Sequence, residues 1–144
     1  MRIAKAIRPV VSGAGATQTL TARDSGSIVL FDRAAGITYT LPPPQVGLWY
    51  EFHVTVTGTG TYRVETSAST IFMSGNVNIE VDDNTTGKAF PGNGTSHLAC
   101  RAAAALSGWL IGGSFSVTCV SSTLWVVKGI LQGSGTLATP FVTS

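Results

Sequence analysis

Polar and apolar residues alternate with a period of two along most of the chain from residue 17 onward. This is the pattern of β-strands that bury one face. The clearest case is residues 48–57, where every even position from 50 to 56 is aromatic or aliphatic. The even positions are therefore predicted to face a core, whereas Trp49, Glu51 and His53 are predicted to face outward.

Similar short patterns recur along the rest of the sequence, and turn residues separate them. The further predicted strands are residues 17–22, 27–31, 37–41, 61–66, 70–73, 76–81, 96–103, 109–112, 114–120 and 124–130. Residues 48–57 and 61–66 are joined by Gly58-Thr59-Gly60, which predicts a β-hairpin. Residues 82–87 and 91–94 are rich in turn formers and are predicted to be loops.

Eight to ten short strands at this spacing predict an all-β fold, a single-domain β-sandwich or jelly roll. Residues 17–130 form the predicted sandwich. Residues 1–16 are predicted to be a basic arm with a linker, and residues 131–144 a C-terminal tail. Both extended ends are expected to become ordered only where they lie on another surface.

Composition narrows the classes of protein that fit this fold. Only 11% of the 144 residues are charged, against roughly 25% in an ordinary soluble domain. Helical bundles need charged outer faces, so this composition excludes them. A net charge of +2 also disfavours electrostatic binding of nucleic acid. No apolar run approaches the length of a membrane span, and Arg8 and Pro9 interrupt the N-terminal segment before it resembles a secretory signal.

The basic residues are concentrated at the N-terminus. Arg2, Lys5 and Arg8 are three of the nine, which leaves six basic against seven acidic residues in the remainder. Ile3 and Ile7 lie four positions apart, so one or two helical turns here would be amphipathic. One interpretation is a solvated, frayed terminus, and the other is an arm that docks on a partner and orders there.

Candidate chemistry is sparse. His53 and His97 are the two histidines, and no Gly-x-Ser-x-Gly nucleophile motif accompanies them. Cys100 and Cys119 are predicted to be small buried thiols, with a disulfide as the alternative. These residues favour a protein that is not an enzyme and holds no cofactor.

Acidic residues offer two further possibilities. Glu51 and Glu65 could lie on one face of the predicted hairpin as a glycosidase pair, but Arg63 on that face favours a network of charges. Residues 82–87 align with the start of an EF-hand loop, but Asn93 stands where the twelfth position needs Glu, which favours a β-turn. No metal site is predicted.

Five stretches match a known pattern: residues 20–26, 28–30, 35–42, 47–52 and 108–114. Their turn-and-strand sequence resembles an all-β module of tailed-bacteriophage structural proteins, with Arg23 at the first position of its Ala-Asp-Ser-Gly motif. Among these proteins, the chain most resembles the capsid cement (decoration) proteins of jelly-roll type found in short-tailed phages.

The resemblance implies a structural protein of the virion, assembled in the host cytoplasm. It would bind the outer capsid surface and clamp adjacent subunits of the major capsid protein against the pressure of packaged DNA. It also implies a homo-oligomer, with a dimer favoured and a trimer possible, and no nucleic-acid or membrane partner. The predicted partner-binding residues are Arg2, Ile3, Lys5, Ile7, Arg8, Trp49, Phe141 and Val142.

Two alternatives remain open at this stage. One is a receptor- or carbohydrate-binding module of a tail or fibre, in which Trp49, Trp109 or Trp125 stacks on a sugar. The other is a hydrolase.

Overall fold

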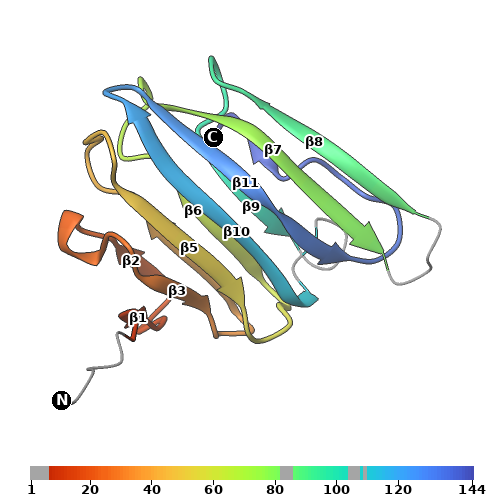
Figure 1. Cartoon of the computed structure of the whole chain (residues 1–144). Coiled ribbons are helices and arrows are strands. Elements are labelled where there is room, and N and C mark those ends of the chain that lie inside the picture. The colour runs from red at the N-terminus through yellow and green to blue at the C-terminus, as the bar shows by residue number, and fades with distance from the viewer. Residues whose placement is uncertain (1–6, 82–85, 104–107, 109) are drawn as a thin grey trace, which may run out of the picture.

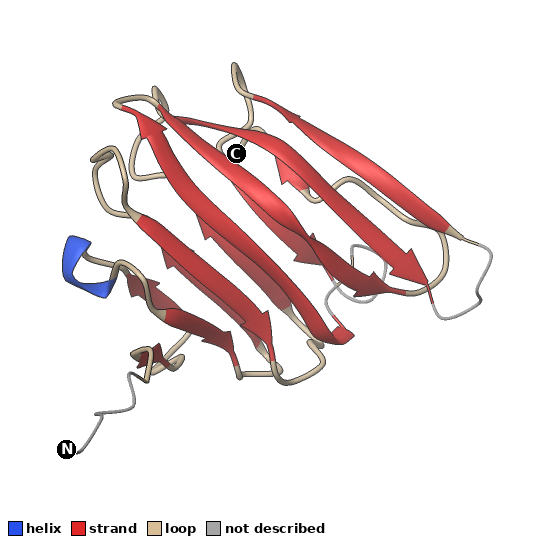
Figure 2. Ribbon diagram, viewed as in Figure 1, coloured by secondary structure: helices blue, strands red, loops and turns tan. Residues whose placement is uncertain are grey.

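Two β-sheets pack face to face in the computed structural model, which describes residues 7–81, 86–103, 108 and 110–144 (Figure 1). The prediction of an all-β sandwich is therefore confirmed. Among the described residues, the one helical segment is a single 3₁₀ turn, Ala22–Asp24, and the other regular elements are strands (Figure 2). No helix in these ranges is long and apolar enough to cross a membrane.

The two sheets differ in size. The seven-stranded sheet has the order β1 (Val10–Val11), β3 (Ile28–Phe31), β5 (Trp49–Val54), β10 (Leu110–Ser121), β11 (Leu124–Gly133), β7 (Phe72–Val81) and β8 (Gly87–Asn93). The five-stranded sheet has the order β12 (Phe141–Val142), β9 (Ala99–Ala103), β6 (Thr61–Glu65), β4 (Gly36–Thr40) and β2 (Thr17–Thr19).

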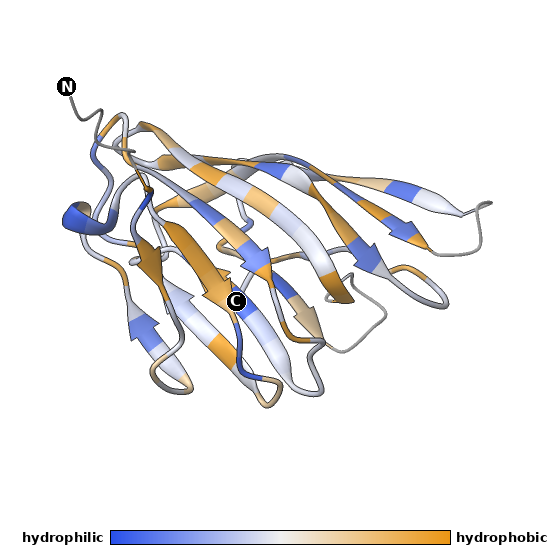
Figure 3. Cartoon of the chain, turned by 60° about the horizontal axis from the view of Figure 1, so that its bottom comes forward, coloured by the Kyte–Doolittle hydropathy of each residue, from blue (hydrophilic) through white to orange (hydrophobic). Residues whose placement is uncertain are grey.

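The period-two alternation has the predicted consequence. Hydrophobic and polar residues follow one another along the strands in Figure 3. On β5, Tyr50, Phe52 and Val54 are buried, whereas Trp49 is 38% exposed. The inward-facing residues of both sheets form one core. Its tyrosines are satisfied internally, because the hydroxyls of Tyr39 and Tyr62 donate to the backbone oxygens of Leu30 and Val56 at 2.7 and 2.6 Å.

The N-terminal half is wound in parallel. From β1 to β6 the chain changes sheet at every strand, so β1, β3 and β5 lie parallel in one sheet and β2, β4 and β6 lie parallel in the other. Parallel neighbours need a crossover connection, and here a strand of the opposite sheet supplies it. This pairing departs from the purely antiparallel ladders of a jelly roll, and alternation alone does not predict it.

The predicted hairpin between residues 48–57 and 61–66 is wrong. β5 and β6 belong to different sheets, where β5 pairs with β3 and β10, and β6 pairs with β4 and β9. The residues between them, 55–60, lead the chain from the seven-stranded sheet to the five-stranded sheet. Both strands still bury their alternate apolar residues, but these meet across the core rather than side by side in one sheet.

Strand boundaries differ from the prediction in the second half. Residues 70–73 and 76–81 belong largely to one strand, β7, and Pro91–Asn93, predicted to be loop, lie in the edge strand β8. An edge strand tolerates proline because one of its sides has no ladder to complete. Residues 82–85, the start of the EF-hand-like segment, lie outside the described residues.

The predicted C-terminal tail, residues 131–144, is part of the sandwich. Leu131–Gly133 complete β11, which pairs with β7 in parallel, and β12 pairs with β9. The boundary placed at residue 130 therefore falls inside a strand. The turn-rich sequence of residues 133–136 suggested a tail, but the apolar pattern on both sides of it continues into the two sheets.

Candidate functional site

The outer faces of the two sheets have different chemistry, and this difference locates the candidate site. Eight large hydrophobic side chains are exposed among the described residues. Five of them lie on strands of the seven-stranded sheet and none lies on a strand of the five-stranded sheet, while Ile7 precedes β1, and Val46 and Val56 lie in the connections that join β5 to the other sheet. The eight are Ile7, Val10, Val46, Trp49, Val56, Ile111, Val120 and Ile130.

The outer face of the five-stranded sheet is polar by contrast. Its outward positions include five threonines, on β2, β4 and β6, and Arg63 forms an ion pair with Glu65 at 2.7 Å. Apolar side chains that gather on one face mark a candidate interaction surface, whereas singly scattered ones are ordinary. The outer face of the seven-stranded sheet, called here the broad face, is therefore the candidate binding surface.

A cluster of four side chains occupies the broad face where β5 lies next to β3. Alternation along β5 sets Trp49, Glu51 and His53 outward, as predicted. Arg8, just before β1, reaches over them: its Nη1 lies 2.5 Å from Oε2 of Glu51, and its Cζ lies 4.7 Å from the centroid of the Trp49 ring. His53 Nε2 lies 2.7 Å from Oε1 of Glu51.

These contacts favour the ionised, carboxylate form of Glu51. Hydrogen bonds from Arg8, and then from His53, hold the pKa of the Glu51 carboxyl below its ordinary value of 4.5. Arg8 also donates from Nε to the Gly26 oxygen at 3.0 Å, and the Ile28 amide donates to the Pro9 oxygen at 2.9 Å. The base of the N-terminal arm is thus tied to the edge of the broad face.

Protonation of Glu51 is expected to loosen this attachment. A carboxyl whose pKa is lowered by folding stabilises the folded form above its unfolded pKa, and that contribution is lost as the pH falls through the folded pKa. Hydrogen exchange of the Ile28 amide measures the attachment directly, because its acceptor is the Pro9 oxygen. We expect its protection factor to be constant at neutral pH and to fall below about pH 4.5, the ordinary carboxyl range.

The variant Glu51→Gln should show lower Ile28 protection already at neutral pH and little further change on acidification. Glu65→Gln is the matched control, because Glu65 pairs with Arg63 on the opposite outer face. Equal protection in the wild type and Glu51→Gln across this pH range would contradict the account.

The predicted arm is only partly described. Arg2, Ile3 and Lys5 lie outside the described residues. Ile7 is 82% exposed, and it immediately precedes Arg8, which is held by Glu51. The described part of the arm therefore starts from a fixed position at one edge of the broad face.

Phe141 does not present the apolar anchor that the sequence predicted for it. It is 2% exposed, it pairs with Cys100 on β9, and its ring stacks on His97 at 5.6 Å between centroids. A Cβ added to Gly92 would lie 2.9 Å from the same ring. Phe141 thus fills the protein's own core, while Val142 beside it is half-buried.

The two carboxylates considered as a glycosidase pair do not come together. Glu51 and Glu65 lie on opposite outer faces, because β5 and β6 belong to different sheets. Cys100 and Cys119 are unpaired and buried, and burial raises the pKa of the Cys100 thiol to about 12. Within the described ranges, no three His, Cys, Asp or Glu residues are grouped so that they could hold a metal ion.

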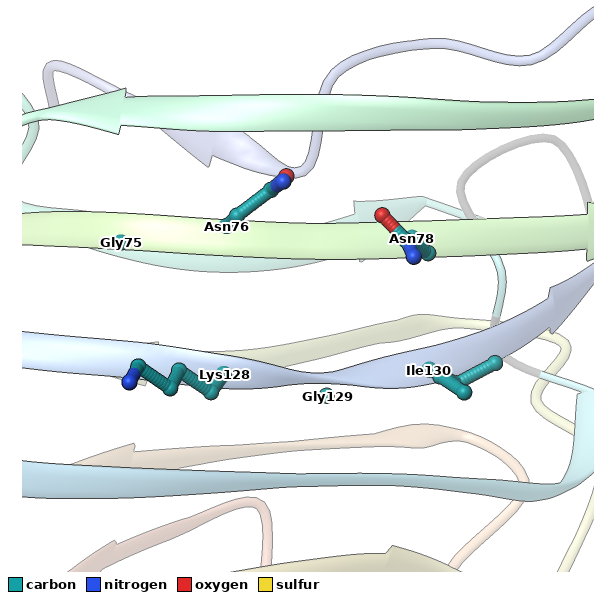
Figure 4. A pocket seen from close by; sticks show the side chains of 6 residues that line it. All are labelled: Gly75, Asn76, Asn78, Lys128, Gly129 and Ile130. Atoms are coloured by element: carbon teal, nitrogen blue, oxygen red, sulfur yellow. The ribbon is translucent and has the colours of Figure 1, made fainter.

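A second feature of the broad face was not identified from the sequence. Between β7 and β11 lies an open hollow of about 410 Å³ (Figure 4). It is lined by Gly75, Asn76, Asn78, Lys128, Gly129 and Ile130. Alternation with buried Val77 and Ile79 could have placed both asparagines on an outer face, but nothing in the sequence pairs residue 76 with residue 128.

The fold and these surfaces define the class: a two-layered all-β protein whose exposed large hydrophobic side chains, among the described residues, favour one of its two outer faces. No known protein family matches the chain, and no curated protein or solved structure is detectably similar to it.

Proposed function

We propose that this protein is a structural component of a phage virion, a cement protein that binds the outer capsid surface and clamps adjacent subunits of the major capsid protein. The observation that supports the proposal is that, among the described residues, five exposed large hydrophobic side chains lie on strands of the seven-stranded sheet and none lies on a strand of the five-stranded sheet. A protein that binds another protein surface needs a face on which apolar side chains are exposed.

Three further features support this proposal. The turn-and-strand motifs resemble those of tailed-phage cement proteins. Charged side chains are few, as in the centre of an interface, and Glu51 on the broad face is already paired with Arg8. The basic arm joins the body at an edge of the same face, so Arg2, Ile3 and Lys5 could extend its contact with the coat.

The proposed mechanism is mechanical. A contact of roughly 1,200–2,000 Å² is modest alone. When one copy, or a homo-oligomer of which the dimer is the favoured form, touches two coat subunits at once, each attachment raises the effective concentration of the other. Many such bridges would oppose the outward pressure of packaged DNA.

The alternative, a carbohydrate-binding module of a tail or fibre, has less support. Trp125 is fully buried, and the ring of Trp49 is approached by the Arg8 guanidinium. A sugar would have to displace Arg8 from that side of the ring, and with it the ion pair to Glu51. Trp109 lies outside the described residues.

Binding to empty capsid shells that lack this protein tests the proposal. We expect Val120→Asp, which places a charge at a 45% exposed position beside the broad face, to weaken binding about tenfold or more, because the carboxylate loses water in the contact. Thr17→Asp, on the five-stranded outer face, is the matched control and should bind as the wild type does. Circular dichroism melting confirms that both variants are folded. Loss of binding in Thr17→Asp with full binding in Val120→Asp would overturn the assignment of the face.

A further inference from the structure

Lys128 occupies an unusual position on the broad face. It lies on β11, and its direct neighbours in the ladders are Ser116 on β10 and Asn76 on β7. Strands extend on both sides of it, so it is central rather than peripheral. A lysine on a protein surface is ordinary, but this one is in the middle of the face that carries the exposed apolar residues.

No carboxylate of the described residues lies within ion-pair distance of Lys128. Glu51, two strands away in the same row of the sheet, is held by Arg8 and His53. Glu80 is opposite Gln132, four residues along β11, and its carboxylate lies beside Gly87 on β8. The ammonium group is therefore unneutralised within the described part of the chain.

Two carboxamides share the hollow with Lys128. Asn76 and Asn78, on β7, line the hollow together with Lys128 on β11, and in Figure 4 the Asn76 amide points toward β8. Among the described residues, no hydrogen bond or ion pair uses the side chains of Asn76, Asn78 or Lys128. Ile130, which is 52% exposed, completes the lining.

Two of the residues that line the hollow are glycines with no room for a side chain. A Cβ on Gly75 would lie 2.1 Å from the Val127 oxygen, and a Cβ on Gly129 would lie 2.4 Å from the Phe115 Cα. Gly75 also has φ = 110°, which disfavours any other residue. Glycine at both positions therefore follows from the close packing of neighbouring strands.

If the broad face is covered by a partner, Lys128 is removed from water. A buried ammonium without a counter-charge is strongly unfavourable, so a stable contact must supply an acceptor with negative charge. The two carboxamides can each donate to the second oxygen of a carboxylate or bond to the backbone beside it. These requirements are met by an Asp or Glu side chain on an exposed segment.

We propose that the hollow between β7 and β11 receives an acidic side chain of the coat protein, which pairs with Lys128 and hydrogen-bonds to Asn76 and Asn78. This proposal rests on the proposed function. The pairing with Lys128 would make the contact between the broad face and the coat protein specific. A matching carboxylate would select one register of the broad face on the coat, because any other register leaves Lys128 unpaired.

Shell binding of Lys128→Gln tests the pairing. We expect an affinity about tenfold lower than that of the wild type, and a weaker dependence of the affinity on salt concentration, because one ion pair is lost. Lys88→Gln is the matched control: Lys88 lies on edge strand β8 with its ammonium over the Phe90 ring, and the same charge is removed. If the wild type binds shells and Lys128→Gln binds equally well, the hollow is not the contact, although the proposed function stands.

A second measurement does not depend on shells. In ¹⁵N spectra of the full chain, a blocked peptide of alternating aspartate and glycine should shift the side-chain amide signals of Asn76 and Asn78, and Lys128→Gln should abolish the shifts. Glucuronate is the comparison probe. Shifts with glucuronate but not with the peptide would reassign the hollow to an acidic sugar, and no shift with either probe would overturn the site itself. Failure of the wild type to bind shells would overturn the coat protein as partner and the proposed function with it.

Discussion

Replacing Phe31 with alanine is expected to lower the free energy of unfolding by about 3–5 kcal/mol, the usual cost of removing a fully buried phenylalanine side chain. Phe31 has no exposed surface. Its ring centroid lies 4.8 Å from that of Tyr62, 5.5 Å from that of Tyr39 and 5.7 Å from that of Phe52. Because these rings come from both sheets, the cavity left by alanine would weaken the contact between the layers.

Urea unfolding monitored by circular dichroism measures this effect. Leu30→Ala is the matched control, since Leu30 is the neighbouring residue, faces the other side of β3 and is only half-buried. Its expected loss is about 1 kcal/mol, in proportion to the smaller apolar area that it buries. Equal losses in the two variants would contradict the assignment of Phe31 to the centre of the core.

Replacing Phe141 with alanine is expected to cost about 3 kcal/mol of stability, near the lower end of the range for phenylalanine because β12 has only two residues. Phe141 stacks on His97 and closes the core beside β9. The melting temperature should fall in the isolated protein, with no coat protein present. Val142→Ala, the adjacent half-buried position, should shift it much less.

This variant distinguishes two roles for the C-terminus. An unchanged melting temperature combined with lost shell binding would make Phe141 an external anchor, as its sequence alone suggested. A lowered melting temperature places it in the protein's own core, as its burial indicates.

The sequence predicts what depends on local alternation. On β5, the outward direction of Trp49, Glu51 and His53 follows from the period of two, because neighbouring side chains of a strand point to opposite faces. The all-β class and most strand positions follow for the same reason. A low charge content correctly excluded a helical bundle.

Pairing between strands was harder to predict. Gly58-Thr59-Gly60 is as suitable for a change of sheet as for a hairpin, so the placement of β5 and β6 in different sheets depends on tertiary contacts. The parallel ladder of β11 with β7 has the same origin. It alone brings Lys128 beside Asn76, and therefore the hollow could not be predicted from the sequence.

For the N-terminal arm too, the sequence identifies a residue of interest but not the residues that it contacts. The sequence singles out Arg8 as one of three N-terminal cations. Its partners, Glu51 and Trp49, lie more than forty residues away along the chain. What the structure adds is that Arg8 is paired within the protein itself, with Glu51 and the Gly26 oxygen.

If this protein coats a capsid, as we propose, its copy number in purified virions will show it. Quantitative mass spectrometry, with the major capsid protein as the internal standard, gives the ratio of the two chains. A cement protein follows the symmetry of the shell, so the account predicts copies on the order of hundreds per virion. A count of about a dozen or fewer would place the protein on the tail, and its absence from virions would contradict the account altogether.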